Sequence, residues 1–134
     1  MPLFEWTPRL SVGVDKIDAE HRCIGELLNE LNKLQNKPSH HGECVQLIDG
    51  LIVQIRSHFS TEERYFTEYE YENADEHRVE HERLLAQLDK SRQEIKCGEC
   101  AGLKLARYLH VWLTTHILVA DKAYVEFFRR MNIR

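Results

Sequence analysis

Apolar residues recur every three or four positions in four long stretches of the chain, a spacing typical of amphipathic α-helices. The first stretch carries Ile17, Ile24, Leu28 and Leu31 on one face, and the other three follow the same plan. The predicted helices run from Asp15 or Asp18 to Pro38, from about Gly42 to Tyr69, from about Asn73 to Gly98, and from about Gly102 to His116.

The connections between these stretches are short, and short connections place consecutive helices antiparallel. We therefore predict an all-α fold, an up-down four-helix bundle formed by one domain that spans residues 1–134. Residues 1–17 contain Pro2 and Pro8 and are expected to form an extended N-terminal arm packed on the bundle. Phe127 and Phe128 belong to a predicted short C-terminal helix that caps the bundle.

The composition limits the kinds of partner. A chain of 134 residues with 43% hydrophobic and 30% charged residues can bury a core around a site. Its net charge of −4 provides no basic surface for nucleic acid. No apolar run approaches the roughly 18 residues of a membrane span, and the opening MPLFEWTPRL lacks the pattern of a signal peptide. We therefore expect a cytoplasmic monomer with no nucleic-acid partner and no membrane span.

The four cysteines are Cys23, Cys44, Cys97 and Cys100. A cytosolic chain with a substantial core does not need disulfides, so free thiols are expected. Cys97 and Cys100 form a CxxC motif, but the chain offers no second pair of ligands at zinc-site spacing. We interpret the motif as structural or incidental.

Five of the eight histidines, together with two carboxylates, fall on or beside the apolar faces of the predicted helices. A single HxxxH or HxxxE pair arises easily by chance in a chain this rich in histidine and glutamate. Seven such residues spread over separate helices are much harder to obtain by chance. They are, in chain order, His21, His58, Glu62, His77, His81, His116 and Asp121.

Helix geometry brings members of this series together. Residues four apart on an α-helix are offset by about 40° and rise by about 6 Å, so His58 with Glu62, and His77 with His81, each present two donors to one point. His116 and Asp121 are five apart, which on a straight α-helix would splay them by about 140°. We therefore expect the fourth helix to end or deform between them.

Imidazole groups bind iron, zinc, copper and nickel, and a carboxylate can bridge two cations and offset their repulsion. Two carboxylates among five histidines therefore predict two adjacent metal ions in the core. Metal should also stabilise the fold, because five histidines buried without a metal are costly.

The remaining histidines and Glu63 are not expected in this site. His40 and His41 lie in a polar stretch between helices, where a solvated loop is expected. His110 stands six positions before His116, which turns it away from the shared face. Glu63 follows Glu62 directly and is expected to turn aside.

The chain resembles the hemerythrin family, particularly its bacterial single-domain type, over nearly its full length. The resembling motifs are Trp6, Val12-Gly13-Val14, Ile17-Asp18 with His21, His58-Phe59 with Glu62, His77 with His81, and Trp112-Leu113 before His116-Ile117 and Asp121. The resemblance implies two iron ions, Fe²⁺ or Fe³⁺, joined by a bridging oxo or hydroxo group. Of the protein ligands it implies, His77, His81 and His116 hold one iron, His21 and His58 hold the other, and Glu62 and Asp121 bridge both.

The resemblance also implies reversible binding of dioxygen at an open position of the second iron, with no catalytic residue. Five histidines and two carboxylates favour the ferrous pair, whereas di-iron oxidases commonly use four glutamates. A dry pocket is needed, because water or protons would help the bound oxygen leave and strand the irons as ferric. The predicted oxygen pocket consists of Ile24, Phe59, Trp112, Leu113 and Ile117, although each also fits ordinary core packing.

Two function classes fit these residues. The first is a non-catalytic oxygen-binding protein for storage, delivery or sensing, and delivery would require an oxygen-consuming partner enzyme. The alternative is a di-iron enzyme acting on oxygen, peroxide or nitric oxide, or an iron-storage role. A bundle that holds zinc merely for stability would need neither an open position nor an apolar pocket.

Overall fold

The computed structural model describes residues 3–34, 41–96 and 102–134. Four long helices are followed by a π-helical turn and a short helix, and a 3-10 turn lies in the N-terminal arm. In chain order the elements are η1 (Pro8–Leu10), α1 (Asp15–Lys33), α2 (His41–Glu68), α3 (Ala74–Lys96), α4 (Gly102–His116), η3 (Ile117–Asp121) and α5 (Val125–Arg130). His40, Cys97 and Cys100 lie outside the described residues.

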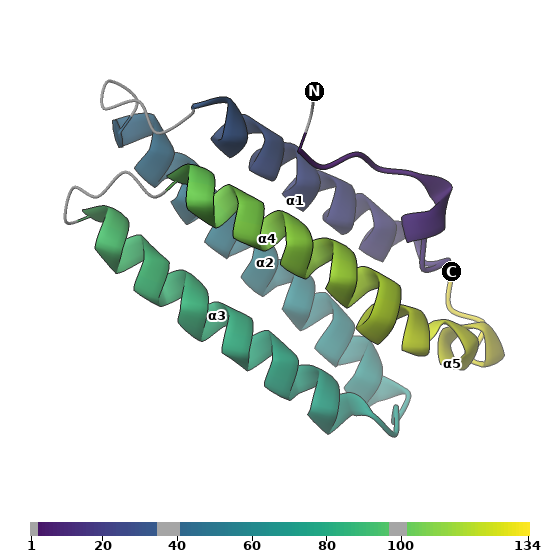
Figure 1. Cartoon of the computed structure of the whole chain (residues 1–134). Helices are drawn as coiled ribbons and strands as arrows, with labels where there is room; N and C mark the ends of the chain where they lie inside the picture. Colours follow the sequence, from purple (N-terminus) through teal and green to yellow (C-terminus); the bar gives the residue numbers. More distant parts are fainter. Residues whose placement is uncertain (1–2, 35–40, 97–101) are drawn as a thin grey trace.

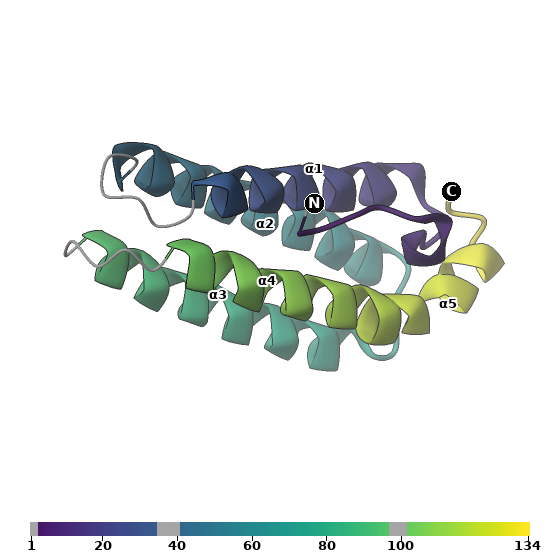
Figure 2. The same cartoon turned by 45° about the horizontal axis from the view of Figure 1, so that its top comes forward.

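The four long helices run alternately up and down and form one bundle (Figures 1 and 2). α1 packs against α2 and α4, and α2 packs against α3. The arm lies along the outside of the bundle, and α5 sits at the end where α4 finishes (Figure 1). The predicted all-α, up-down four-helix bundle with an N-terminal arm and a short C-terminal helix is confirmed. Within the described ranges, no helix combines the length and apolarity needed to cross a membrane.

The predicted capping role of Asp15 or Asp18 is wrong. α1 begins at Asp15, inside the expected arm, and its N-cap residue Val14 makes no side-chain cap. The Asp18 carboxylate instead turns back to the arm, where it accepts hydrogen bonds from the Ser11 hydroxyl at 2.6 Å and the Val12 amide at 2.9 Å. Asp18 therefore fixes the arm to the first turns of α1, which keeps His21 in place one turn further on.

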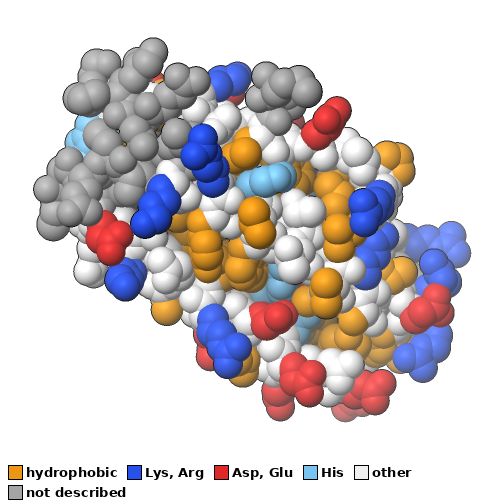
Figure 3. All heavy atoms as spheres, viewed as in Figure 1, with side chains coloured by type: hydrophobic (Ala, Val, Ile, Leu, Met, Phe, Trp, Pro, Cys, Tyr) orange, Lys and Arg blue, Asp and Glu red, His pale blue; other side chains and the backbone are white. Residues whose placement is uncertain are grey.

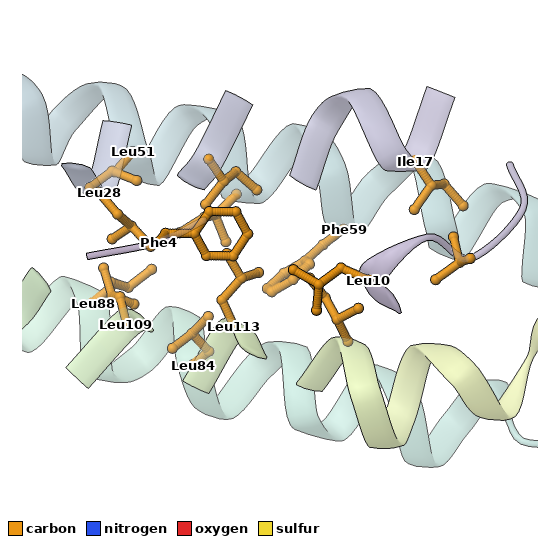
Figure 4. Packing of buried hydrophobic residues seen from close by; sticks show 14 of the residues in the cluster. Phe4, Leu10, Ile17, Leu28, Leu51, Phe59, Leu84, Leu88, Leu109 and Leu113 are labelled. Carbon is orange, nitrogen blue, oxygen red and sulfur yellow. The ribbon is translucent and has the colours of Figure 1, made fainter. Parts of the chain in front are cut away.

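The start of the arm is held by hydrogen bonds between the Phe4 backbone and the Asn29 side chain and by close packing. The Asn29 side chain accepts from the Phe4 amide at 2.7 Å and donates to the Phe4 carbonyl at 2.8 Å. The Phe4 ring lies directly over Gly25, where a methyl group would overlap it. Figure 4 shows this ring among buried leucines of the bundle, including Leu113. The arm thus contributes to the core above α1 and α4.

The buried faces follow the predicted spacing. Ile17, Ile24, Leu28 and Leu31 of α1 are each at most 2% exposed, and the apolar stripes of the other long helices are buried against them. Each such side chain stabilises the fold by about 1.5–3 kcal/mol relative to remaining exposed. Ten polar or charged residues are also buried among the described residues, and seven of them are the predicted metal ligands.

Candidate metal centre

All seven predicted ligands converge inside the bundle, toward the end where α4 finishes. α1 supplies one histidine, α2 a histidine and a glutamate, α3 two histidines and α4 one histidine, and η3 supplies the aspartate. Each is at most 5% exposed, and three of them are fully buried. The seven are His21, His58, Glu62, His77, His81, His116 and Asp121.

Their donor atoms fall into two groups, each compact enough to surround one metal ion. Within each group the donor atoms lie no more than 4.8 Å from one another. One group combines three histidines with Glu62, and the other combines two histidines with Glu62 and Asp121. In full, the groups are Glu62, His77, His81 and His116, and His21, His58, Glu62 and Asp121. The donor set is thus uneven, with three imidazoles on one side and two on the other.

Glu62 and Asp121 each reach both groups. The Oε1 atom of Glu62 lies 2.7 Å from His58 Nε2, while its Oε2 atom lies 3.3 Å from His77 Nε2. The Oδ2 atom of Asp121 lies 3.1 Å from His21 Nε2, and its Oδ1 atom lies 3.0 Å from His77 Nε2. Each carboxylate therefore directs one oxygen toward each donor group, as a bridge between two cations requires.

The step from His116 to Asp121 is made by a π-helical turn. Residues Ile117–Asp121 adopt this wider turn directly after α4. His116 Nε2 consequently lies 3.1 Å from Asp121 Oδ1, although the two residues are five apart. The predicted deformation of the fourth helix is confirmed, and π-turns of this kind occur often at functional sites.

The buried polar atoms at the centre have too few partners without a cation. Among the described residues, no hydrogen-bond partner is found for the Nε2 atoms of three histidines or for any of the four carboxylate oxygens in the centre. These atoms belong to Glu62, His77, His81, His116 and Asp121. Buried polar atoms are normally satisfied, and convergent nitrogen and oxygen donors are what divalent transition metals bind. The residues present therefore fit a pair of metal ions.

Charges in the metal-free centre balance through protonated histidines. Burial disfavours a charged imidazole, but Glu62 and Glu20 overcome it and raise the pKa of His58 to about 10. Burial likewise opposes the charge on His77, and the adjacent carboxylates of Asp121 and Glu62 raise its pKa to about 9. Two imidazolium charges can thus offset the two buried carboxylates when no metal is bound.

The pKa values of three other groups are also set by the balance between burial and neighbouring charges. Burial and Asp121 both act to raise the pKa of Glu62, yet His58 and His77 lower it to about 2. The pKa of Asp121 also falls well below its ordinary value, because His116, His21 and His77 outweigh its burial. His81 differs, since burial lowers its pKa to about 3. His81 is therefore neutral and ready to bind metal at neutral pH.

Carboxylates hold the outer nitrogens of three histidines, and sequence reasoning did not assign these partners. His58 Nδ1 lies 2.8 Å from Glu20 Oε1, and Thr61 donates to the other Glu20 oxygen at 2.9 Å. Glu63 turns aside from the donor groups, as expected, but its Oε2 atom lies 3.3 Å from the outer nitrogen Nδ1 of His81.

The third pair joins α4 to α3, where His116 Nδ1 lies 3.5 Å from Glu80 Oε2. Such outer carboxylates orient imidazole ligands and increase their basicity. Glu20 stands directly before His21 in the chain but acts on a histidine of α2. Proximity in sequence therefore gave no signal for this partner.

Tyr124 is a further residue that the sequence did not single out. It is fully buried, and its ring centroid lies 5.7 Å from that of His77. Its hydroxyl finds no hydrogen-bond partner in the part of the chain that the structure describes. Burial raises its pKa well above the usual value, with Asp121 and Glu62 adding to the effect. The phenol is therefore a neutral polar group beside the carboxylates.

A small apolar cavity adjoins the centre, and four of the five predicted pocket residues line it. Ile24, Phe59, Trp112 and Leu113 line it, and the polar residues in its wall are His58 and His116, one from each half of the centre. Its volume is about 10 Å³, roughly one water-sized sphere. Ile117 is fully buried but does not line this cavity.

The remaining residues considered from the sequence lie away from the centre. His41 stands at the start of α2, and the His110 ring packs edge-on against Phe4 with the centroids 6.4 Å apart. Cys23 is half-buried and Cys44 is buried. None of these four belongs to either donor group found among the described residues.

Comparisons with known proteins agree with this arrangement. The sequence model of a family described as "Hemerythrin HHE cation binding domain" matches residues 12–128. The chain is 32% identical to a bacteriohemerythrin of Stenotrophomonas maltophilia, over 94% of this chain and 82% of that protein. It is 30% identical to a bacteriohemerythrin of Pseudomonas aeruginosa, over 92% of this chain and 80% of that protein.

Solved structures share the fold. The crystal structure of a wild-type hemerythrin superposes with a TM-score of 0.87 at 25% sequence identity. The matched region covers 92% of this chain and 96% of that chain. The likeness therefore extends over most of the chain rather than over an isolated helical pair.

Proposed function

The chain belongs to the hemerythrin family, and from that premise we propose that it binds dioxygen reversibly at a pair of iron ions in the bundle core. The binding would serve oxygen storage, delivery or sensing. The observation that carries the proposal is the small apolar cavity whose wall contains His58 from one donor group and His116 from the other. A small apolar molecule in this cavity would lie beside both halves of the centre.

In the proposed centre the two donor groups have different tasks. His77, His81 and His116 would hold one iron, and His21 and His58 the other, with Glu62, Asp121 and a solvent-derived oxo or hydroxo group as bridges. Two imidazoles in place of three leave one iron with a free position. When bound, the iron pair would lend one electron from each ion to dioxygen and recover both on release.

The surroundings favour binding over oxidation of a substrate. Phe59 stacks on the His81 ring with centroids 3.6 Å apart, and Trp112 stacks on the His116 ring at 4.3 Å. These rings, with Ile24 and Leu113, give the cavity a largely apolar wall that disfavours water. A volume of about 10 Å³ leaves no room for an organic substrate beside dioxygen. We therefore propose a protein without catalytic residues, acting as a cytoplasmic monomer that supplies an oxygen-consuming enzyme.

One titration tests the proposal. The protein is loaded with ferrous iron without oxygen, exposed to air and then returned to vacuum while the visible absorption is recorded. Reversible binding predicts a charge-transfer band that appears in air and disappears under vacuum, with no consumption of reductant. Continuous consumption of reductant would instead establish an enzyme acting on oxygen. A colourless protein that retains two zinc ions in preference to iron would contradict both.

A further inference from the structure

A surface groove lies beside His116, and it shares Trp112 and His116 with the wall of the cavity. α4 and η3 form most of it, and Glu80 of α3 closes one side. Its volume is about 320 Å³, which is within the range of roughly 300–1,000 Å³ for sites that bind small molecules. Trp112 and His116 form part of its wall. The groove therefore touches the candidate metal centre directly.

The walls of the groove are unusually apolar for an exposed surface. Six large hydrophobic side chains are strongly exposed in the described part of the chain, and three of them, Tyr108, Val111 and Val119, line this groove. They follow one face of α4 and its π-turn extension. In Figure 3 hydrophobic side chains gather over this side of the molecule, with histidine visible between them. Clustered apolar exposure of this kind marks a binding surface.

The groove also has a direct aromatic connection to the centre. The Trp112 ring stacks on the His116 ring with centroids 4.3 Å apart and an angle of 15° between the planes. His116 Nε2 in turn points at Asp121, on the inner side of the same ring. A molecule in the groove would thus be separated from the centre by a single layer of aromatic side chains. That layer gives electrons a short path inward.

The charge of the groove narrows the identity of its occupant. Glu80 carries the one charge in its lining, and no lysine or arginine lines it among the described residues. An anionic donor, such as one bearing phosphates, would find no partner there and would meet the Glu80 carboxylate. The Glu80 carboxylate and the Thr115 hydroxyl can instead accept hydrogen bonds from the O–H groups of a neutral ligand.

We propose that this groove binds a neutral, planar two-electron donor of the hydroquinone class, which restores the centre after it has been oxidised. The proposal rests on the di-iron function proposed above. The hydroquinone loses two electrons and two protons and becomes a quinone, and each of two Fe³⁺ ions gains one electron and becomes Fe²⁺. Both protons pass to water at the open side of the groove.

A matched pair of variants tests the site. Val111 in the groove and Val53 on α2, outside it, are each 63% exposed, so glutamate should be tolerated equally at both positions. The probe is duroquinone, whose fully methylated ring does not add to cysteine thiols. Equilibrium dialysis against the di-ferric protein should show saturable binding to the parent chain and to Val53→Glu. Val111→Glu should weaken it by about tenfold or more, because the bound quinone would cover the new carboxylate and remove part of its water.

The second measurement is anaerobic reduction of the same di-ferric proteins by durohydroquinone. The rate should saturate with donor concentration in the parent chain and in Val53→Glu, and should fall by about tenfold in Val111→Glu at sub-saturating donor. Equal binding and equal rates in the two variants would overturn the proposal that this groove binds the donor. A separate experiment distinguishes the groove proposal from the oxygen-binding proposal. The protein is reduced with dithionite and then taken through the air and vacuum cycle, which tests oxygen binding without any ligand in the groove.

Discussion

His116 Nε2 lies 3.1 Å from Asp121 Oδ1 across the π-helical turn that ends α4. On a continued α-helix these side chains would be separated by about 140°. The wider turn places the Asp121 carboxylate between both donor groups, where its other oxygen lies 3.1 Å from His21. One local change of helix type thus joins the first and last helices of the bundle at the centre.

This position predicts the effect of Asp121→Asn. The variant keeps the shape of the side chain but loses the negative charge that balances two cations, so we expect the affinity for the second metal to fall by at least about 10–100-fold. At metal concentrations too low to fill the weakened site, ferrous titration should give a stoichiometry near one ion per chain. Asp89→Asn, at an exposed ion pair with Arg56, is the control and should still bind two ions. Two ions of unchanged affinity in Asp121→Asn would remove Asp121 from the ligand set.

Metal loading should release protons in a pH-dependent way. In the metal-free centre His58 and His77 have pKa values raised to about 10 and about 9, so both carry protons at pH 7 and must lose them to bind metal. Glu62 and His81, with pKa values of about 2 and about 3, have already lost theirs. Loading at pH 7 should therefore release at least about two protons per chain.

The same shifts fix the sign of the pH dependence. A raised histidine pKa stabilises the folded metal-free chain fully below about 6.5, and this contribution disappears as the pH rises through about 9 to 10. Proton release on loading should decline over that same upper range. Anaerobic calorimetry in two buffers of different ionisation enthalpy measures the release directly. Release near zero at pH 7 would show that the histidines are neutral before metal binds.

Much of the centre could be predicted from sequence because helix periodicity does most of the positioning. His58 with Glu62, and His77 with His81, are one turn apart, so their convergence follows as soon as the helices and their buried faces are known. The same spacing predicted the bundle itself. The five-residue step to Asp121 also indicated a deformation, although periodicity alone does not distinguish a π-turn from a helix end.

The parts that sequence reasoning missed depend on contacts between helices. Glu20 of α1 meets His58 of α2, and Glu63 of α2 meets His81 of α3, and no spacing along one helix encodes either pair. The role of Asp18 was missed for a related reason. Its carboxylate had a helix N-terminus and the amide of Val12 as competing partners, and the fold of the arm decided between them.

Glu20 predicts a positioning effect on His58. Glu20→Gln leaves the side chain in place but removes the charge that holds His58 Nδ1 at 2.8 Å, so metal affinity should fall by about 10–100-fold. Glu80→Gln provides the comparison, because Glu80 is 50% exposed and 3.5 Å from His116 Nδ1, and its effect should be smaller. Competition with a metal chelator measures both. An effect of Glu80→Gln equal to that of Glu20→Gln would contradict the dependence on burial.

The cavity predicts faster autoxidation in Leu113→Asn. Leu113 is 5% exposed and lines the cavity beside His58 and His116, so an amide there would bring a hydrogen-bond donor and water to bound oxygen. We expect iron to be retained and the oxygenated band to decay several-fold faster at constant temperature. The matched comparison is Leu113→Met, which keeps the cavity apolar. Equal decay rates in the two variants would show that excluding water at Leu113 does not control the lifetime of the oxygenated protein.

Contact between the arm and α1 predicts opposite effects of alanine at two helical glycines. Gly25→Ala should destabilise the fold by about 1–3 kcal/mol, since a methyl group there overlaps the buried Phe4 ring and forces the arm outward. Gly50 of α2 has open space around its Cα, so Gly50→Ala should stabilise by up to about 1 kcal/mol through helix propensity. Urea unfolding of the iron-loaded proteins measures both changes. Phe4 also packs beside His110 of α4, so a displaced arm would lose contacts with both helices. Equal stability of the Gly25→Ala and Gly50→Ala chains would mean that the arm does not contribute to the core.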